Sequence, residues 1–171
     1  MSLDKGTFMA AAIDLAAAAL EKGELPIAAV VALDGEVIAQ AHASEVTDGR
    51  FLVHAELLAL LEFDQLKLSV DQRRESALFS TLEPCMMCLG ACHSSFVGHV
   101  YYALESPIDG AGEVAARLQG ERQNCPRQNC PTVAGGMLRD ESLALFETYI
   151  SKHSSGAMWR WAKALVEGLP G

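Results

Sequence analysis

The chain has 171 residues, of which 50% are hydrophobic and 20% charged, and its formal net charge is −9. This length suffices for one well-filled core and is short for two, so we expect a single domain over residues 1–171. The negative charge disfavours tight binding to nucleic-acid phosphates. The apolar run 10–20 is too short to span a bilayer and has no basic flank, which excludes a membrane segment or leader there.

The first half of the chain predicts a helix, a hairpin and a second helix. The alanine-rich stretch 5–22 favours a helix ending at Gly23, because glycine suits the left-handed position after a helix. Asp34-Gly35 separates two β-rich stretches and is typical of a two-residue hairpin turn. The expected elements are a helix over 5–22, strands over 27–33 and 37–41, a loop over 44–51 and a helix from about 54 to 63.

The second half continues the alternation and ends in helices. A strand that follows a crossover helix favours parallel pairing with the strand before that helix. The expected elements are a connection over 64–75, a strand over 77–80, a helix over 85–95, a strand over 100–104, a loop over 105–112, a short helix over 113–118, a long excursion over 120–136, a helix over 139–151 and a helical extension over about 155–169. These elements predict an α/β sandwich of helices around one mixed sheet.

Two motifs supply the groups of a catalytic zinc site. His54-Ala55-Glu56 and Pro84-Cys85-Met86-Met87-Cys88 each stand at the start of a predicted helix. One imidazole and two thiolates fill three corners of a tetrahedral site and leave the fourth for water, which zinc activates by lowering its pKa to roughly 7. Glu56 can then move protons between that water and a leaving amine. The motifs predict a hydrolytic deaminase with one Zn²⁺ per chain.

Each piece of this site is also compatible with a simpler interpretation. Cys-x-x-Cys alone suits a redox pair or half of a structural zinc site. His54 alone suits an ordinary partly buried histidine, and Glu56 alone suits a solvated helix carboxylate. The combined interpretation is favoured because ligands from two helix starts can converge on one metal, whereas a redox pair leaves the His-x-Glu motif unexplained.

The wider motifs resemble the cytidine and deoxycytidylate deaminase-like superfamily, nearest its branch of tRNA adenosine deaminases and guanine deaminases. The resemblance covers roughly residues 5–150 and is carried by the segments 25–31, 54–60 and 81–92. It implies a three-layer α/β/α sandwich with a mixed five-stranded sheet, and a homodimer. It also implies that main-chain groups near Ala55, Pro84 and Cys85 orient the ring.

Substrate identity is predicted from a departure from those relatives. The asparagine that contacts the base in bacterial tRNA adenosine deaminases falls on Ala43, and the tryptophan before it falls on His42. Alanine cannot make the hydrogen bonds of an amide. With the net charge of −9, this favours a small free base, nucleoside or analogue as substrate. A tRNA adenosine-to-inosine deaminase is the alternative, and a non-catalytic zinc-binding protein the second alternative.

Several further side chains are candidates to contact a small substrate or to complete the site. The candidates are His42, Arg50, Phe51, Glu83 and Asp109, although Glu83 is also suited to binding backbone groups in its own turn. Trp159 and Trp161 are expected to pack on the core or on a second subunit. Five cysteines with no leader favour a reducing cytoplasmic location, with Cys92 packed beneath the site. Cys125 and Cys130 are expected to be unpartnered loop cysteines, and a second metal site or a redox pair is the alternative.

Overall fold

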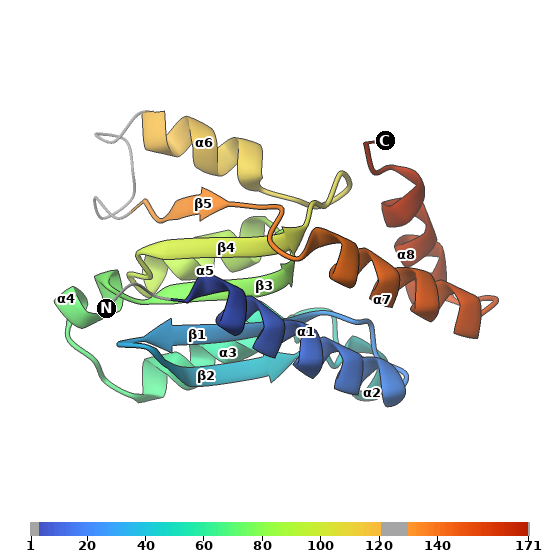
Figure 1. Ribbon diagram of the computed structural model, residues 1–171, viewed down its shortest axis with the longest axis horizontal. Helices are drawn as coiled ribbons and strands as arrows, with labels where there is room; N and C mark the ends of the chain where they lie inside the picture. The colour runs from blue at the N-terminus through green and yellow to red at the C-terminus, as the bar shows by residue number, and fades with distance from the viewer. Residues whose placement is uncertain (1–3, 121–129, 171) are drawn as a thin grey trace.

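The computed structural model describes residues 4–120 and 130–170, and its centre is one five-stranded sheet (Figure 1). The strands run in the order β2-β1-β3-β4-β5. Their bounds are β1 Ala28–Leu33, β2 Glu36–His42, β3 Ala77–Leu82, β4 His99–Leu104 and β5 Thr132–Ala134. The strands β1 and β3 are buried along their whole length, as expected of central strands that are covered on both faces.

The pairing pattern is mixed, as the sequence predicts. β1 pairs antiparallel with β2 and with β3, whereas β3, β4 and β5 pair in parallel. The turn between β1 and β2 has Asp34 at φ 53° and Gly35 at φ 89°, the two left-handed positions that the predicted hairpin turn requires. The parallel order brings the carboxyl ends of β3 and β4 to one edge of the sheet.

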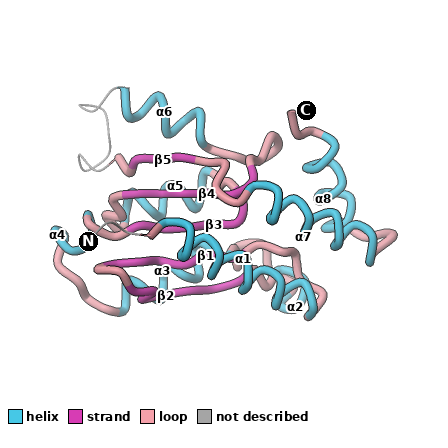
Figure 2. Tube along the Cα trace, viewed as in Figure 1, coloured by secondary structure: helices cyan, strands magenta, loops and turns pink. Residues whose placement is uncertain are grey.

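Helices cover both faces of the sheet and form three layers (Figures 1 and 2). The helices are α1 Lys5–Glu21, α2 Glu45–Asp48, α3 Ala55–Gln65, α4 Val70–Arg74, α5 Met86–Ser94, α6 Gly112–Gly120, α7 Arg139–Lys152 and α8 Ala157–Glu167. α1 and α7 lie on the face towards the viewer, whereas α3 and α5 lie behind the sheet. The predicted three-layer α/β/α sandwich is confirmed.

Three short elements and one cysteine differ from the expectations. The predicted loop 44–51 contains α2, the predicted connection 64–75 contains α4, and the excursion 120–136 contains the strand β5. Each has only three to five residues, too few for a periodic pattern to develop. Cys130 forms a disulfide, so the prediction that it is unpartnered is wrong. Cys125 lies outside the described residues.

The C-terminal segment of the structure forms the helix α8. α8 packs against α7, at the end of the sheet where β3 and β4 finish (Figure 1), and falls within the predicted extension 155–169. That the whole chain is one domain stays a prediction. Within 4–120 and 130–170, no helix has both the length and the apolar character needed to span a membrane.

Candidate metal centre and active site

The three predicted metal ligands converge at the start of two helices. His54 is the N-cap of α3 and Cys85 is the N-cap of α5, while Cys88 lies in the first turn of α5. Both caps have extended backbone, with ψ of 144° at His54 and 173° at Cys85, so each side chain stands just ahead of its helix. The positive ends of the two helix dipoles therefore lie beside the thiolates.

The donor set fits a zinc ion. His54 Nδ1 lies 3.7 Å from Cys85 Sγ and 3.7 Å from Cys88 Sγ, and all three donor atoms lie within 4.8 Å of one another. Tetrahedral zinc, with Zn–S near 2.3 Å and Zn–N near 2.0 Å, needs donor separations of about 3.6 Å. His54, Cys85 and Cys88 are thus positioned to bind one metal ion through one nitrogen and two sulfurs.

Glu56 stands at the metal centre, in the first turn of α3. Its side chain is buried, with Oε2 3.6 Å from Cys88 Sγ. Oε1 accepts a hydrogen bond of 3.1 Å from the Ser80 hydroxyl, which comes from the buried strand β3. Burial is the main cause that raises the pKa of Glu56, against the lowering effect of backbone hydrogen bonding. A raised pKa suits a carboxylate that must both accept and release protons.

The metal-free ligands share their protons unequally. Hydrogen bonding with Cys88, and then with His54, lowers the pKa of Cys85 to about 4, although burial opposes this. The hydrogen bond with Cys85 is the main cause that raises the pKa of His54 to about 9. The pKa of Cys88 is raised by Cys85 and by burial. Cys85 is therefore the more acidic of the two thiols.

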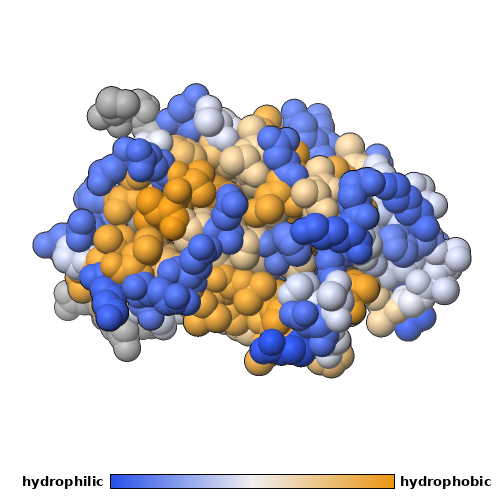
Figure 3. All heavy atoms as spheres, turned by 90° about the horizontal axis from the view of Figure 1, so that it is seen from below, coloured by the Kyte–Doolittle hydropathy of each residue, from blue (hydrophilic) through white to orange (hydrophobic). Residues whose placement is uncertain are grey.

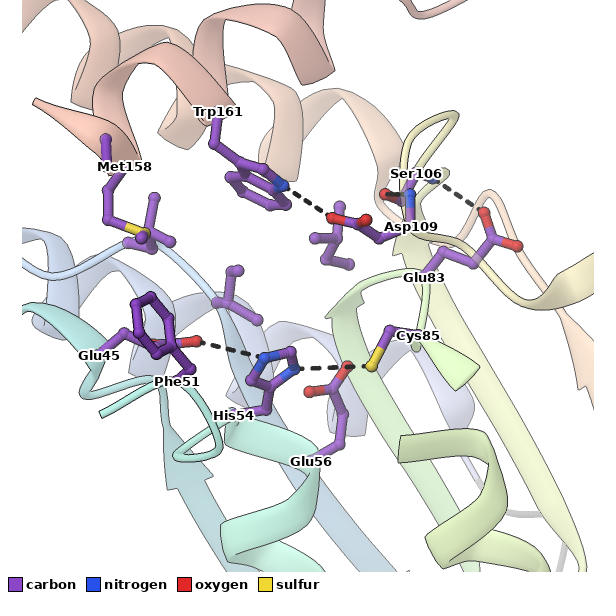
Figure 4. Close-up of a pocket in the computed structure, with 14 residues that line it drawn as sticks. Glu45, Phe51, His54, Glu56, Glu83, Cys85, Ser106, Asp109, Met158 and Trp161 are labelled. Carbon is purple, nitrogen blue, oxygen red and sulfur yellow. Dashed lines mark hydrogen bonds and ion pairs between the residues drawn. The ribbon is translucent and has the colours of Figure 1, made fainter. Parts of the chain in front are cut away.

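A cavity of about 340 Å³ opens above these groups (Figure 4). Its volume falls within the range of roughly 300–1,000 Å³ that is usual for small-molecule sites. The lining residues are Leu25, Ile27, Glu45, Phe51, His54, Glu56, Leu82, Glu83, Cys85, Ser106, Asp109, Ala157, Met158 and Trp161. The lining is largely apolar, and its charged side chains away from the metal ligands and Glu56 are all acidic.

The structure brings three of the predicted substrate residues to this cavity. Phe51, Glu83 and Asp109 line it. The lining residues do not include the other predicted contacts, namely His42, Ala43, Arg50, Ala55 and Pro84. His42 donates from Nδ1 to the Ala43 carbonyl oxygen at 2.7 Å, and Arg50 is exposed.

Glu83 and Asp109 are both held by neighbouring groups. The Glu83 carboxylate accepts the amide of Ser106 at 2.8 Å and that of Gly112 at 2.7 Å. Both of its oxygens therefore bind backbone, but that of the segment after β4 rather than that of its own turn, which the alternative interpretation expected. Asp109 Oδ2 accepts a hydrogen bond of 2.7 Å from Trp161 Nε1. This bond connects α8 to the loop after β4 across the mouth of the cavity (Figure 4).

Four residues of the site have no signal in the sequence motifs. Ser80 is brought to Glu56 by the position of β3 in the sheet. Met158 and Trp161 enter the site because α8 folds back over it. Glu45 lies in the unpredicted helix α2, with Oε1 3.8 Å from His54 Nε2. Trp161 was expected on the core or a partner, and it does contact Phe146 in the core, with ring centroids 6.3 Å apart.

Comparison with known proteins identifies the family. Residues 3–104 match the family described as the cytidine and deoxycytidylate deaminase zinc-binding region. The chain belongs to this family. Among the deaminases it resembles, the tRNA-specific adenosine deaminase of Bacillus subtilis is 40% identical over 136 residues, which cover 78% of this chain and 81% of the relative. That of Streptococcus pyogenes serotype M18 is 32% identical over 150 residues, 86% of this chain and 91% of the relative.

Solved deaminase structures agree with the fold. A structure from a study of adenosine-to-inosine editing by tRNA deaminases at the wobble position superposes with a TM-score of 0.69 at 31% identity, covering 82% of this chain and 99% of that one. The guanine deaminase of Nitrosomonas europaea gives 0.66 at 26% identity, covering 85% and 84%. The predicted family and zinc cofactor are confirmed. For the substrate, these relatives favour the tRNA alternative over the small-base interpretation.

Proposed function

We propose that this deaminase replaces an exocyclic amine of a heterocycle by oxygen and releases ammonia. Adenosine in tRNA is the substrate class that the sequence relatives favour. The observation that carries the reaction type is the buried Glu56 carboxylate, with Oε2 3.6 Å from Cys88 Sγ in the His54, Cys85 and Cys88 cluster. A purely structural zinc site has no use for a carboxylate at that place.

The proposed mechanism assigns the proton transfers to Glu56. His54, Cys85 and Cys88 would hold the zinc ion, which would supply Lewis acidity and lower the pKa of a water molecule to roughly 7. Glu56 accepts a proton from the attacking water and delivers it to the adjacent ring nitrogen. It then carries the second proton from the new hydroxyl to the departing amine, so that a carbonyl forms and ammonia leaves. Ser80 holds Oε1 and keeps Oε2 towards the metal.

A small aminated base or nucleoside is the second candidate substrate, and the walls of the cavity favour it. Glu45, Glu83 and Asp109 make the lining acidic, and Ala43 lies outside it. The hydrogen bond from Trp161 to Asp109 closes one side of the mouth. A nucleic-acid loop carries phosphates that these acids repel, and the net charge of −9 opposes its approach.

The deciding experiment measures ammonia release by the zinc-loaded protein. The substrates are a tRNA with adenosine at the wobble position, guanine, adenine, cytosine, their nucleosides, pterins and aminated triazines, each with a Glu56→Gln control. Inosine formed in tRNA alone would establish the tRNA function, whereas turnover of a small molecule alone would establish the second candidate. If the whole panel gave no ammonia above the control, hydrolytic deamination would be rejected in favour of the zinc-binding alternative.

We also infer a homodimer in the cytoplasm. Several large apolar side chains are exposed near the metal centre, including Phe51 at 80%, Leu52 at 63% and Met86 at 59%. Figure 3 shows that apolar surface also gathers in patches on the face seen from below. Such patches are typical of surfaces that associate with a partner, and a second copy would cover them. Cys85, Cys88 and Cys92 are not in disulfides, and from them we infer a reducing compartment, although the disulfide at Cys130 opposes this.

A further inference from the structure

The side of His54 that faces away from the two cysteines meets a carboxylate. Nδ1 points to Cys85 and Cys88, so Nε2 is directed elsewhere, and Glu45 Oε1 lies 3.8 Å from it. Figure 4 shows this contact beneath Phe51, on the wall of the cavity opposite Cys85. Histidines that bind metals commonly give their second N–H to a carboxylate, which fixes the tautomer and the orientation of the ring.

Glu45 is held in this place by a second buried acid. The Glu24 side chain is 1% exposed, and its oxygens accept the backbone amides of Val46 at 3.0 Å and Thr47 at 2.7 Å. These two bonds fix the backbone of α2 directly after Glu45. The Glu45 side chain is only 10% exposed, so the contact with His54 is not a mobile surface ion pair.

Folding stability does not explain why a carboxylate stands at Glu45. Its Oε2 atom is buried and makes no hydrogen bond within the described residues. A buried carboxylate oxygen without a partner opposes folding, because its hydration is lost without replacement. The Glu24 carboxylate, which binds the amides directly after Glu45, is a second acid close to it. A carboxylate kept at such a site is more readily explained by what it does for His54.

We propose that Glu45 is a positioning residue for the zinc ligand His54, forming a carboxylate–histidine–metal arrangement with Glu24 as the support of α2. Glu45 keeps the Nε2 proton in place, so that Nδ1 presents its lone pair to the metal. This inference rests on the proposed function only in that it requires a zinc ion bound by His54. Its test therefore reads metal binding directly, and a deaminase assay without turnover does not decide it.

The test compares Glu45→Ala and Glu45→Gln with the native chain. Zinc affinity is measured by competition with a chromophoric chelator, and ligand geometry by the visible absorption of the cobalt(II)-substituted protein. Glu45→Ala is expected to lose about 10- to 100-fold in zinc affinity and to shift the cobalt bands. Glu45→Gln keeps an acceptor oxygen and is expected to recover part of this loss. The melting temperature of the metal-free protein is expected not to fall, because the native side chain is poorly satisfied.

Asp48→Asn is the matched control. Asp48 lies on the same short helix, is exposed, and accepts a hydrogen bond from the Ser44 hydroxyl rather than facing the metal centre. Its zinc affinity and cobalt spectrum should equal those of the native chain. The proposal would be overturned by native zinc affinity and an unchanged cobalt spectrum in Glu45→Ala. It would equally be overturned if the control lost as much affinity as Glu45→Ala, since the effect would then come from α2 as a whole.

Discussion

The floor and the roof of the cavity are held by different kinds of interaction. The floor, defined by His54, Glu56, Cys85 and Cys88, stands at the starts of α3, which packs on the sheet, and of α5, which packs on α3. The roof, defined by Phe51, Met158 and Trp161, is joined to the loop after β4 by one hydrogen bond between Trp161 and Asp109. We therefore propose that the chemistry depends on the floor and the selection of the substrate on the roof.

The largest effect is expected when one of the zinc ligands on the floor of the cavity is removed. Cys85→Ser should lose zinc and with it all measurable turnover, because the thiolate is one of three protein ligands. Cys92→Ala is the control, since Cys92 is buried but is not among the three clustered ligands. It should retain one zinc per chain and lose about 1 kcal/mol of unfolding free energy, the value of a small buried group. Metal analysis and denaturant titration measure both.

Glu56→Gln tests the proton transfers on the same floor. The amide keeps the size of the side chain but cannot accept a proton, so kcat should fall by about 10²- to 10⁴-fold while zinc stays bound. Glu62→Gln, an exposed change on the same helix, should leave kcat unchanged. Near-native turnover in the Glu56→Gln variant would remove Glu56 from the mechanism.

The floor could be predicted from the sequence because its parts are close in the chain. His54 and Glu56 are two residues apart, Cys85 and Cys88 three, and each motif begins a helix with a recognisable apolar pattern. The Asp34-Gly35 turn and the parallel pairing of β3 with β4 were predictable for the same reason. Local chemistry and local conformation agree at these positions.

Of the roof, only Phe51 was predicted from the sequence, because the other contacts join distant segments. Trp161 and Asp109 are 52 residues apart, and nothing in either segment indicates the other. Glu45 faces His54 only because Glu24, which is 22 residues before Val46, holds α2. The absence of an amide at Ala43 could be seen in the sequence, but the positions of the acidic and aromatic side chains around the cavity require the fold.

The Trp161→Phe substitution is expected to loosen the contact between α8 and the loop after β4 while keeping an aromatic ring in the roof. The new side chain cannot donate a hydrogen bond to the Asp109 carboxylate. A hydrogen bond to a charged group contributes about 1.5 kcal/mol. We therefore expect KM to rise roughly tenfold. Trp159→Phe is the matched control, because it removes a hydrogen bond of 3.2 Å from the same helix to the Ile150 carbonyl, on α7. An equal rise in KM for both variants would attribute the effect to α8 stability. If Trp161→Phe improved turnover of tRNA, the roof would be a barrier to the larger substrate.

The smallest effect is expected for Phe51→Ala, which should weaken substrate binding with little change in folding stability. The side chain is 80% exposed, so Phe51→Ala should change the unfolding free energy by less than about 0.5 kcal/mol. Phe51 lines the cavity, whereas Arg50 beside it does not, and an aromatic contact with a ring contributes about 0.5–1 kcal/mol. Phe51→Ala should therefore raise KM by about two- to fivefold, and Arg50→Ala should leave KM for a small base unchanged.

For a tRNA substrate we expect the opposite order of effects. Arg50→Ala would then remove a positive charge that can contact a phosphate, and the effect of Phe51→Ala would be the smaller one. The ratio of the two effects thus reports which substrate the roof selects.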